Sequence, residues 1–233
     1  NVDLELIVKN ATFSYPDRPE AAKDIHIDVE VHYDGVQNDN TTVDVNKFHL
    51  NMGGNPLDLE LNLRTPISDP FTNGKLKTKL DLASLTDIIP LEDTRIRGNI
   101  DINLDWMGKY SSIENERYDD FKADGSIKIK QLSYKSPDVP DAVKIRKAEI
   151  YVSPRNVGIS SFDAVMGSSD FELSGNLTNY IGWLLRNEVV KGELRLNAKR
   201  IDLNELMVSD TEDEGSRAEI EEETEDTPPA VIE

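Results

Sequence analysis

The segment Leu57-Asp-Leu-Glu-Leu-Asn-Leu63 places leucine at every second position, with a polar residue at each position between. A period of two is that of a β-strand, whose successive side chains point to opposite faces of a sheet. Segments 27–33, 100–106 and 194–198 alternate in the same way. Because one side is apolar and the other is polar, the pattern favours antiparallel sheet with one face in water. Parallel strands covered by helices would instead give continuous apolar runs.

Helical signals are few and short. Residues 111–118 begin with serines that are candidate N-caps and carry Glu114 in the first turn. Segments 83–89, 180–185 and 203–208 each have the length for one or two turns. We therefore predict an all-β, antiparallel fold with a few short helices.

The chain repeats itself with a period near 120 residues. The pairs matched at an offset of 121 are Lys9/Lys130, Phe13/Tyr134, Pro16/Pro137, Asp17/Asp138, Pro19/Pro140, Ala21/Ala142 and Lys23/Lys144. Later pairs are Phe48/Phe162, Met52/Met166, Gly53/Gly167 and Leu59/Leu173 at 114, Gly74/Gly192 and Leu76/Leu194 at 118, and Asp81/Asp202 and Leu82/Leu203 at 121. The first change of offset falls near the turn residues 34–40, where a true duplication would place an insertion.

This repeat divides the chain into predicted units. Residues 1–89 form the first β repeat, 90–126 a connecting strand and short helix, and 127–208 the second β repeat. Residues 209–233 hold eleven acidic residues and one basic residue, Arg217, which is typical of a disordered, solvated linker or tail. The chain opens on a strand-like segment with no starting Met, so we expect it to be a piece of a longer protein.

Composition excludes several classes of function. The formal net charge of −19 argues against binding to nucleic acid, which requires basic faces. The absence of cysteine excludes disulfides, thiolate metal sites and cysteine nucleophiles. No apolar run approaches the ~18–20 residues of a membrane-spanning helix. No nucleophile elbow, phosphate-binding loop, dinucleotide fingerprint or metalloprotease motif occurs, so we predict no enzyme activity and no cofactor.

Several segments of the second repeat resemble one known family. They are Tyr134-Lys-Ser-Pro-Asp-Val-Pro140, Phe162-Asp-Ala-Val-Met-Gly-Ser-Ser-Asp-Phe-Glu-Leu-Ser-Gly-Asn-Leu-Thr-Asn-Tyr180, Gly192-Glu-Leu-Arg-Leu196 and Ile201-Asp-Leu-Asn-Glu-Leu-Met207. Together they are similar to the periplasmic part of AsmA-like proteins (AsmA/TamB type), most of all to the version found in Bacteroidetes. The tail ending Thr227-Pro-Pro-Ala-Val-Ile-Glu233 is similar to the linker after which such proteins begin another β unit.

The resemblance implies a periplasmic protein of Gram-negative cells, anchored to the inner membrane by a segment outside these residues. Its repeated β units would form an elongated, curved and grooved sheet with an apolar inner face. The family is associated with outer-membrane biogenesis and with phospholipid transport between membranes. Phospholipid or another acyl lipid is then the expected partner, and components of outer-membrane assembly are further possible partners.

The apolar stripes of the alternating strands are the candidates for the groove. They are Ile27, Val29, Val31, Leu57, Leu59, Leu61, Leu63, Ile100, Ile102, Leu104, Trp106, Leu194 and Leu196. The same stripes also fit a closed core between two sheets, as in a β-sandwich, and the alternation does not separate the two.

One cluster of potential metal ligands lies on a single strand. His26, Asp28, Glu30 and His32 share a face, but the two histidines are six residues apart. That separation is about 20 Å at ~3.3 Å per residue, which is too far for one metal ion. We interpret this face as solvated and predict no metal site.

Three functions remain as hypotheses. The first is a non-enzymatic module that contributes an apolar groove to lipid transfer or outer-membrane assembly. The second is a purely structural or protein-interaction β domain, such as a surface sandwich or an adhesin-type spacer, with a closed core. The third is an acidic glycan-handling enzyme, which would need two carboxylates held across a cleft.

Overall fold

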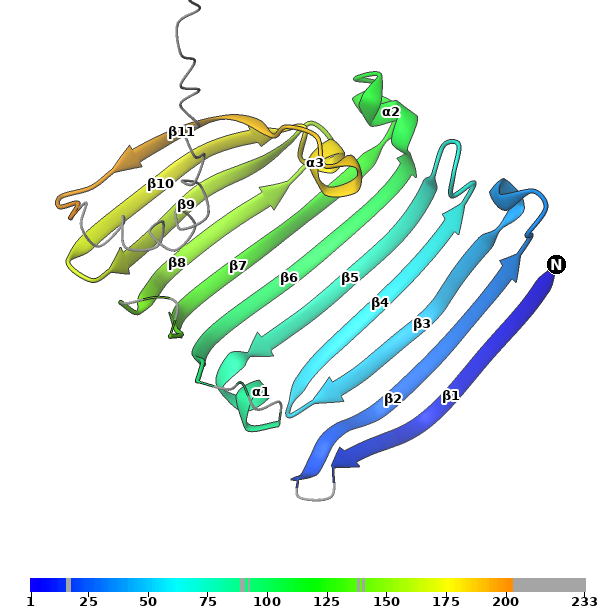
Figure 1. Cartoon of the computed structure of the whole chain (residues 1–233), viewed down its shortest axis with the longest axis horizontal. Coiled ribbons are helices and arrows are strands. Elements are labelled where there is room, and N and C mark those ends of the chain that lie inside the picture. The colour runs from blue at the N-terminus through cyan, green and yellow to red at the C-terminus, as the bar shows by residue number, and fades with distance from the viewer. Residues whose placement is uncertain (16–17, 89–90, 92, 138, 140, 203–233) are drawn as a thin grey trace, which may run out of the picture.

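The computed structural model describes residues 1–15, 18–88, 91, 93–137, 139 and 141–202, which form one antiparallel sheet of eleven strands (Figure 1). The strands pair in chain order, so the sheet is a meander whose two edges, within the described residues, are β1 and β11. The strands are β1 (Val2–Tyr15), β2 (Arg18–Tyr33), β3 (Thr42–Met52), β4 (Asn55–Arg64), β5 (Phe71–Asp81), β6 (Arg95–Lys109), β7 (Lys122–Lys135), β8 (Val143–Val152), β9 (Asn156–Met166), β10 (Ser169–Thr178) and β11 (Lys191–Asn197). The predicted all-β, antiparallel fold is confirmed.

The described helices are short and sit in connections between strands. They are α1 (Leu82–Ile88), α2 (Tyr110–Glu114), α3 (Tyr180–Arg186) and the 3₁₀ turns η1 (Asn38–Asn40) and η2 (Tyr118–Asp120). Figure 1 shows α2 and α3 at one end of the sheet and α1 at the other. The segments predicted as helix at 83–89 and 180–185 correspond to α1 and α3. The predicted helix at 203–208 and the predicted acidic tail at 209–233 lie outside the described residues.

The predicted helix at 111–118 is only partly right. α2 ends at Glu114, and a separate turn, η2, follows at 118–120. The N-cap position belongs to Lys109, whose side chain makes no capping hydrogen bond. Ser111 instead donates from its backbone N–H and its hydroxyl to the carboxylate of Asp69, each at 2.9 Å. The serine therefore joins α2 to the neighbouring β4–β5 connection, a contact that sequence spacing does not reveal.

The internal repeat is present in the strands themselves. The bounds of β9 and β10 are those of β3 and β4 with 114 added to each residue number. Backbone irregularities repeat too, because left-handed residues occur at Asn10 and Gln131, at Gly53 and Gly167, and at Thr65 and Asn179. Five strands thus recur as β1–β5 and β7–β11, and β6 joins the two sets into one sheet. β7 begins at Lys122, within the segment predicted as the connection.

The two faces of the sheet differ in chemistry. Directly paired residues of antiparallel strands lie on the same face, so the register identifies each face. On one face, Lys75 of β5 lies between Glu60 of β4 and Asp105 of β6. Lys128 of β7 likewise lies between Asp101 and Glu149. Opposite charges face one another across strands there, as expected for a face in water.

The other face is apolar, and no second layer of strands covers it within the described part of the chain. Few side chains are therefore fully buried, since most domains bury their apolar faces between two layers. The buried apolar residues among those described are Ala22, Ile88, Tyr110, Ile113, Phe121, Ala148 and Ala164. The larger aliphatic residues of the sheet are half-buried against one another.

Each copy of the repeat has a buried polar residue at the same position, and its side chain makes hydrogen bonds to the backbone of a neighbouring segment. Asn55, 2% exposed, follows the β3–β4 turn; its amide donates to Met52 O at 2.7 Å and to Ser84 Oγ at 2.8 Å. Its carbonyl oxygen accepts from the backbone N–H of Asp81. In the second copy Ser169 replaces Asn55, and its hydroxyl accepts from the N–H of Asp202 at 2.9 Å. In the first copy the contact ties the end of β5 to the start of the adjacent β4, and in the second copy it ties the segment after β11 to the start of β10.

Substitution of Asn55 by alanine should lower the free energy of unfolding by about 2–3 kcal/mol, because several buried hydrogen bonds lose one partner each. Urea denaturation followed by circular dichroism measures this change. Asn73→Ala is the control: Asn73 lies on the polar face and donates to Asn62 at 3.3 Å, so its loss should cost under about 0.5 kcal/mol. Equal losses for the two variants would contradict the role given to Asn55.

Candidate lipid-binding face

All thirteen predicted groove residues lie on the apolar face of the sheet. Direct pairing connects them in rows that cross the strands. One row is Val29, Val45, Leu61, Gly74, Trp106 and Ala123, and another is Ile102, Ile127, Ile150, Ile159, Gly175 and Leu194. Ile27 and Val31 of β2, Leu57, Leu59 and Leu63 of β4, Ile100 and Leu104 of β6 and Leu196 of β11 belong to parallel rows. The stripes therefore make one continuous surface from β1 to β11.

The same surface includes residues that the alternating stripes did not select. They are Val43, Val45 and Phe48 of β3, Ile127 and Ile129 of β7, Ile150 of β8, Ile159 and Phe162 of β9, and Leu173 and Leu177 of β10. In β7, Ile127 and Ile129 alternate with lysines, so the criterion of alternating apolar and polar residues also identifies them. In β3 the register shifts between Val45 and Phe48, and this bulge breaks the alternation.

The apolar face is hollowed beneath α3 into a cavity of about 390 Å³. Its floor comes from strands β4 to β8 and its roof from the helix. The floor includes Leu61, Leu76, Leu104 and Trp106, and the roof includes Ile181 and Leu184. α3 follows β10, yet it encloses this space together with β4, six strands away. The sheet must therefore curve with its apolar face concave, and Figure 1 shows α3 lying over the sheet.

Glycine makes room for the largest side chain of the floor. Trp106 on β6 pairs directly with Gly74 on β5. A Cβ atom at Gly74 would lie inside the van der Waals radius of the indole ring. The ring therefore lies flat over the backbone of β5, which forms a smooth apolar wall for the cavity. The next row follows the same pattern, because Leu104 lies over Gly125 of β7.

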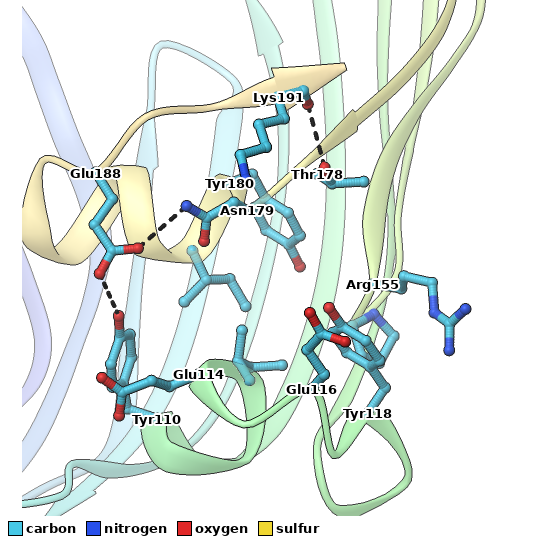
Figure 2. A pocket seen from close by; sticks show the side chains of 13 residues that line it. Tyr110, Glu114, Glu116, Tyr118, Arg155, Thr178, Asn179, Tyr180, Glu188 and Lys191 are labelled. Carbon is cyan, nitrogen blue, oxygen red and sulfur yellow. Dashed lines mark hydrogen bonds between the residues drawn. The ribbon is translucent and has the colours of Figure 1, made fainter. Parts of the chain in front are cut away.

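Two tyrosines separate this apolar cavity from a polar pocket at the end of the sheet (Figure 2). Tyr110 and Tyr180 line both spaces, as does Ile181. The Tyr110 hydroxyl donates to a Glu188 carboxylate oxygen at 3.4 Å, and the Tyr180 hydroxyl donates to Ser153 O at 2.8 Å. Burial raises the pKa of Tyr180 to about 12. Each tyrosine thus presents its ring to the apolar side and its hydroxyl to the polar side.

The polar pocket has a volume of about 260 Å³ and is built around the ends of α3 and α2. Asn179 donates to Glu188 at 3.1 Å, and the Thr178 hydroxyl donates to Lys191 O at 3.4 Å. The guanidinium of Arg155 lies 4.8 Å from the ring centre of Tyr118. Figure 2 shows Asn179, Tyr180 and Glu188 close together, with the Arg155 guanidinium pointing away from them, so the pocket offers hydrogen-bonding partners beside the apolar cavity.

The histidines lie on the opposite, polar face. His26 of β2 pairs with His49 of β3, and their ring centres are 6.1 Å apart. His49 Nδ1 lies 2.7 Å from an Asp58 carboxylate oxygen, and His32 Nδ1 lies 2.6 Å from one of Asp3. Among the described residues, no group of three or more potential ligands has metal-binding geometry.

No described helix is both long and apolar enough to cross a bilayer. Comparison of the chain with protein-family models, with curated proteins and with solved structures finds no match. The interpretation of the face therefore depends on its own geometry and on the family resemblance of the sequence.

Proposed function

We propose that this protein is a non-enzymatic β-repeat module that presents an apolar groove to acyl lipids. On the sequence resemblance, we place it in the periplasm as part of an AsmA-like protein anchored to the inner membrane. There it would contribute to outer-membrane biogenesis by helping phospholipids pass between membranes. No reacting group is needed for this function, because shielding a hydrocarbon chain from water is sufficient.

The observation that carries the proposal is the uncovered apolar face. A soluble protein rarely exposes a contiguous apolar surface of this extent unless the surface binds something. An acyl chain suits the cavity under α3 because the surface of that cavity is almost wholly apolar. An acyl chain has no hydrogen-bonding groups that such a surface would leave without a partner. Each CH₂ group taken from water into such a place contributes up to about 0.8 kcal/mol.

The direct test is to ask whether purified protein carries or binds lipid. Protein purified from a bacterial host should yield phospholipid in an organic extract analysed by thin-layer chromatography. Native mass spectrometry should detect the same lipid on the intact protein. A fluorescent fatty acid should bind in a saturable manner with a blue-shifted emission. Protein that contains no lipid and leaves the fluorescent probe unshifted would contradict the proposal.

A structural or protein-interaction role remains as the alternative, favoured by the free edges of the sheet. Among the described strands, β1 and β11 each have one partner strand, and such edges can pair with a strand of another protein. On β11 the edge residues Leu194 and Leu196 are about half exposed. Under this alternative the lipid measurements would be negative.

A further inference from the structure

The two copies of the repeat differ most at the connection that contains α3. Residues 65–70 join β4 to β5 without a helix, whereas residues 179–190 join β10 to β11 and include α3. This connection has six residues in the first copy and twelve in the second, so six residues have been added there. The left-handed residue that starts the connection is kept, as Thr65 in the first copy and Asn179 in the second.

The added helix changes an open face into an enclosed space. Ile181 and Leu184 stand opposite the floor, to which β4, β5 and β6 contribute Leu61, Leu76, Leu104 and Trp106. The helix is held in place by the hydrogen bond from Tyr180 to Ser153 O and by contacts of Asn179 and Glu188. The cavity volume of about 390 Å³ lies within the ~300–1,000 Å³ of small-molecule sites.

The cavity also has a polar end. Tyr110 and Tyr180 stand between it and the polar pocket, where Glu188, Lys191 and Arg155 are located (Figure 2). A chain of carbon atoms in the cavity could therefore place a polar end group among hydroxyls and charged side chains. Two other pockets of the described part, which include Lys79, Asp101 and Lys128, are instead lined mostly by residues of the charged face.

We infer that the space beneath α3 is a discrete seat for a single acyl chain of an amphiphile, with its polar end at the Tyr110–Tyr180 rim. This inference rests on the proposed function and adds a location and a stoichiometry to it. The helix of the second copy encloses one chain against strands that include β4 and β5 of the first copy, whereas the corresponding connection of the first copy has no helix.

The tryptophans provide a built-in reporter of this seat. The chain has two, and Trp106 lines the cavity whereas Trp183 on α3 is 56% exposed and does not line it. In a Trp183→Phe protein, all tryptophan fluorescence comes from Trp106. A brominated acyl chain quenches a tryptophan only when the two are in close contact, so quenching reports occupation of the cavity itself.

The experiment titrates the Trp183→Phe protein with 9,10-dibromostearate. We expect saturable quenching at one probe per protein. Ala123→Phe fills the cavity from β7 beside Trp106. This variant should need at least a tenfold higher probe concentration for half-maximal quenching. Ser126→Phe places the same ring on β7 but on the polar face, where Ser126 pairs with Asn103, and should leave the titration unchanged.

Total probe binding is measured in parallel by equilibrium dialysis with the same fatty acid. Binding without quenching of Trp106 would overturn the seat and leave the proposed function standing. Quenching that Ala123→Phe and Ser126→Phe weaken equally would also overturn it, because the effect would not be local to the cavity. Absence of binding in dialysis would overturn both the seat and the proposed function.

Discussion

Replacement of Leu104 by aspartate should lower the affinity for a fluorescent fatty acid at least tenfold. Leu104 lies in the floor of the cavity on β6, between Leu76 and Gly125 in its row. The change removes apolar contact that is worth up to about 1.5–3 kcal/mol, and a tenfold change in affinity needs only about 1.4 kcal/mol. A carboxylate beside the acyl chain would in addition lose hydration without gaining a partner. Titration of the probe, followed by its emission shift, measures the effect.

The matched control lies one residue away on the same strand. Asn103→Asp adds the same charge to the polar face, where Asn103 pairs with Lys77. Its affinity for the probe should remain within twofold of the parent protein. Leu104→Thr keeps a strand-forming residue but introduces a hydroxyl. It tests the same prediction if the aspartate variant does not fold. If all three variants bind the probe as the parent does, the apolar face is not the lipid-binding surface.

The sheet could be predicted because its strands are governed by a local rule. Leu57 to Leu63 and Ile100 to Trp106 alternate strictly, and both segments form strands with the expected faces. The repeat added long-range information, since a residue such as Gly53 recurs as Gly167 in the same left-handed turn conformation. Alternation and duplication together predict an extended antiparallel sheet, without any knowledge of its partners.

The sequence did not decide whether the apolar face is open. A leucine such as Leu61 alternates with polar neighbours whether it faces a second sheet or a groove, because the period depends only on the backbone. The deciding fact is the order of pairing, in which each described strand lies beside its neighbours in sequence and none of them crosses over the face. That order depends on all ten connections together, and no single segment encodes it.

The cavity could not be predicted for a related reason. Its roof, from Ile181 and Leu184, and its floor, from Leu61, are more than 100 residues apart in sequence and meet only because the sheet curves. The helix itself was predicted at 180–185, and the repeat offset indicates an insertion there. The sequence pattern does not predict the curvature of the sheet, which places α3 over β4–β6.

Replacement of Gly74 by valine should expel Trp106 from its place over β5. The new side chain would occupy the space of the indole ring, and overpacking of this kind costs about 1–3 kcal/mol. The gain in strand propensity from glycine to valine offsets up to about 1 kcal/mol of that cost, so a net loss of stability is expected. Urea denaturation measures the loss, and in the Trp183→Phe background the emission of Trp106 should shift to longer wavelength as the ring enters water.

Gly158→Val tests whether the effect is specific to the ring. Gly158 lies on β9, and a Cβ atom there would meet only the side-chain oxygen of Asn176 at 3.3 Å and a backbone oxygen at 4.0 Å. Valine at that position should be neutral or slightly stabilising, because it fits a strand and reduces the freedom of the unfolded chain. The double variant Gly74→Val/Trp106→Ala should recover part of the stability lost in Gly74→Val, since the clash is removed. Failure of that recovery, or an unchanged Trp106 emission in Gly74→Val, would show that the indole does not lie over Gly74 and that this wall of the cavity is built differently.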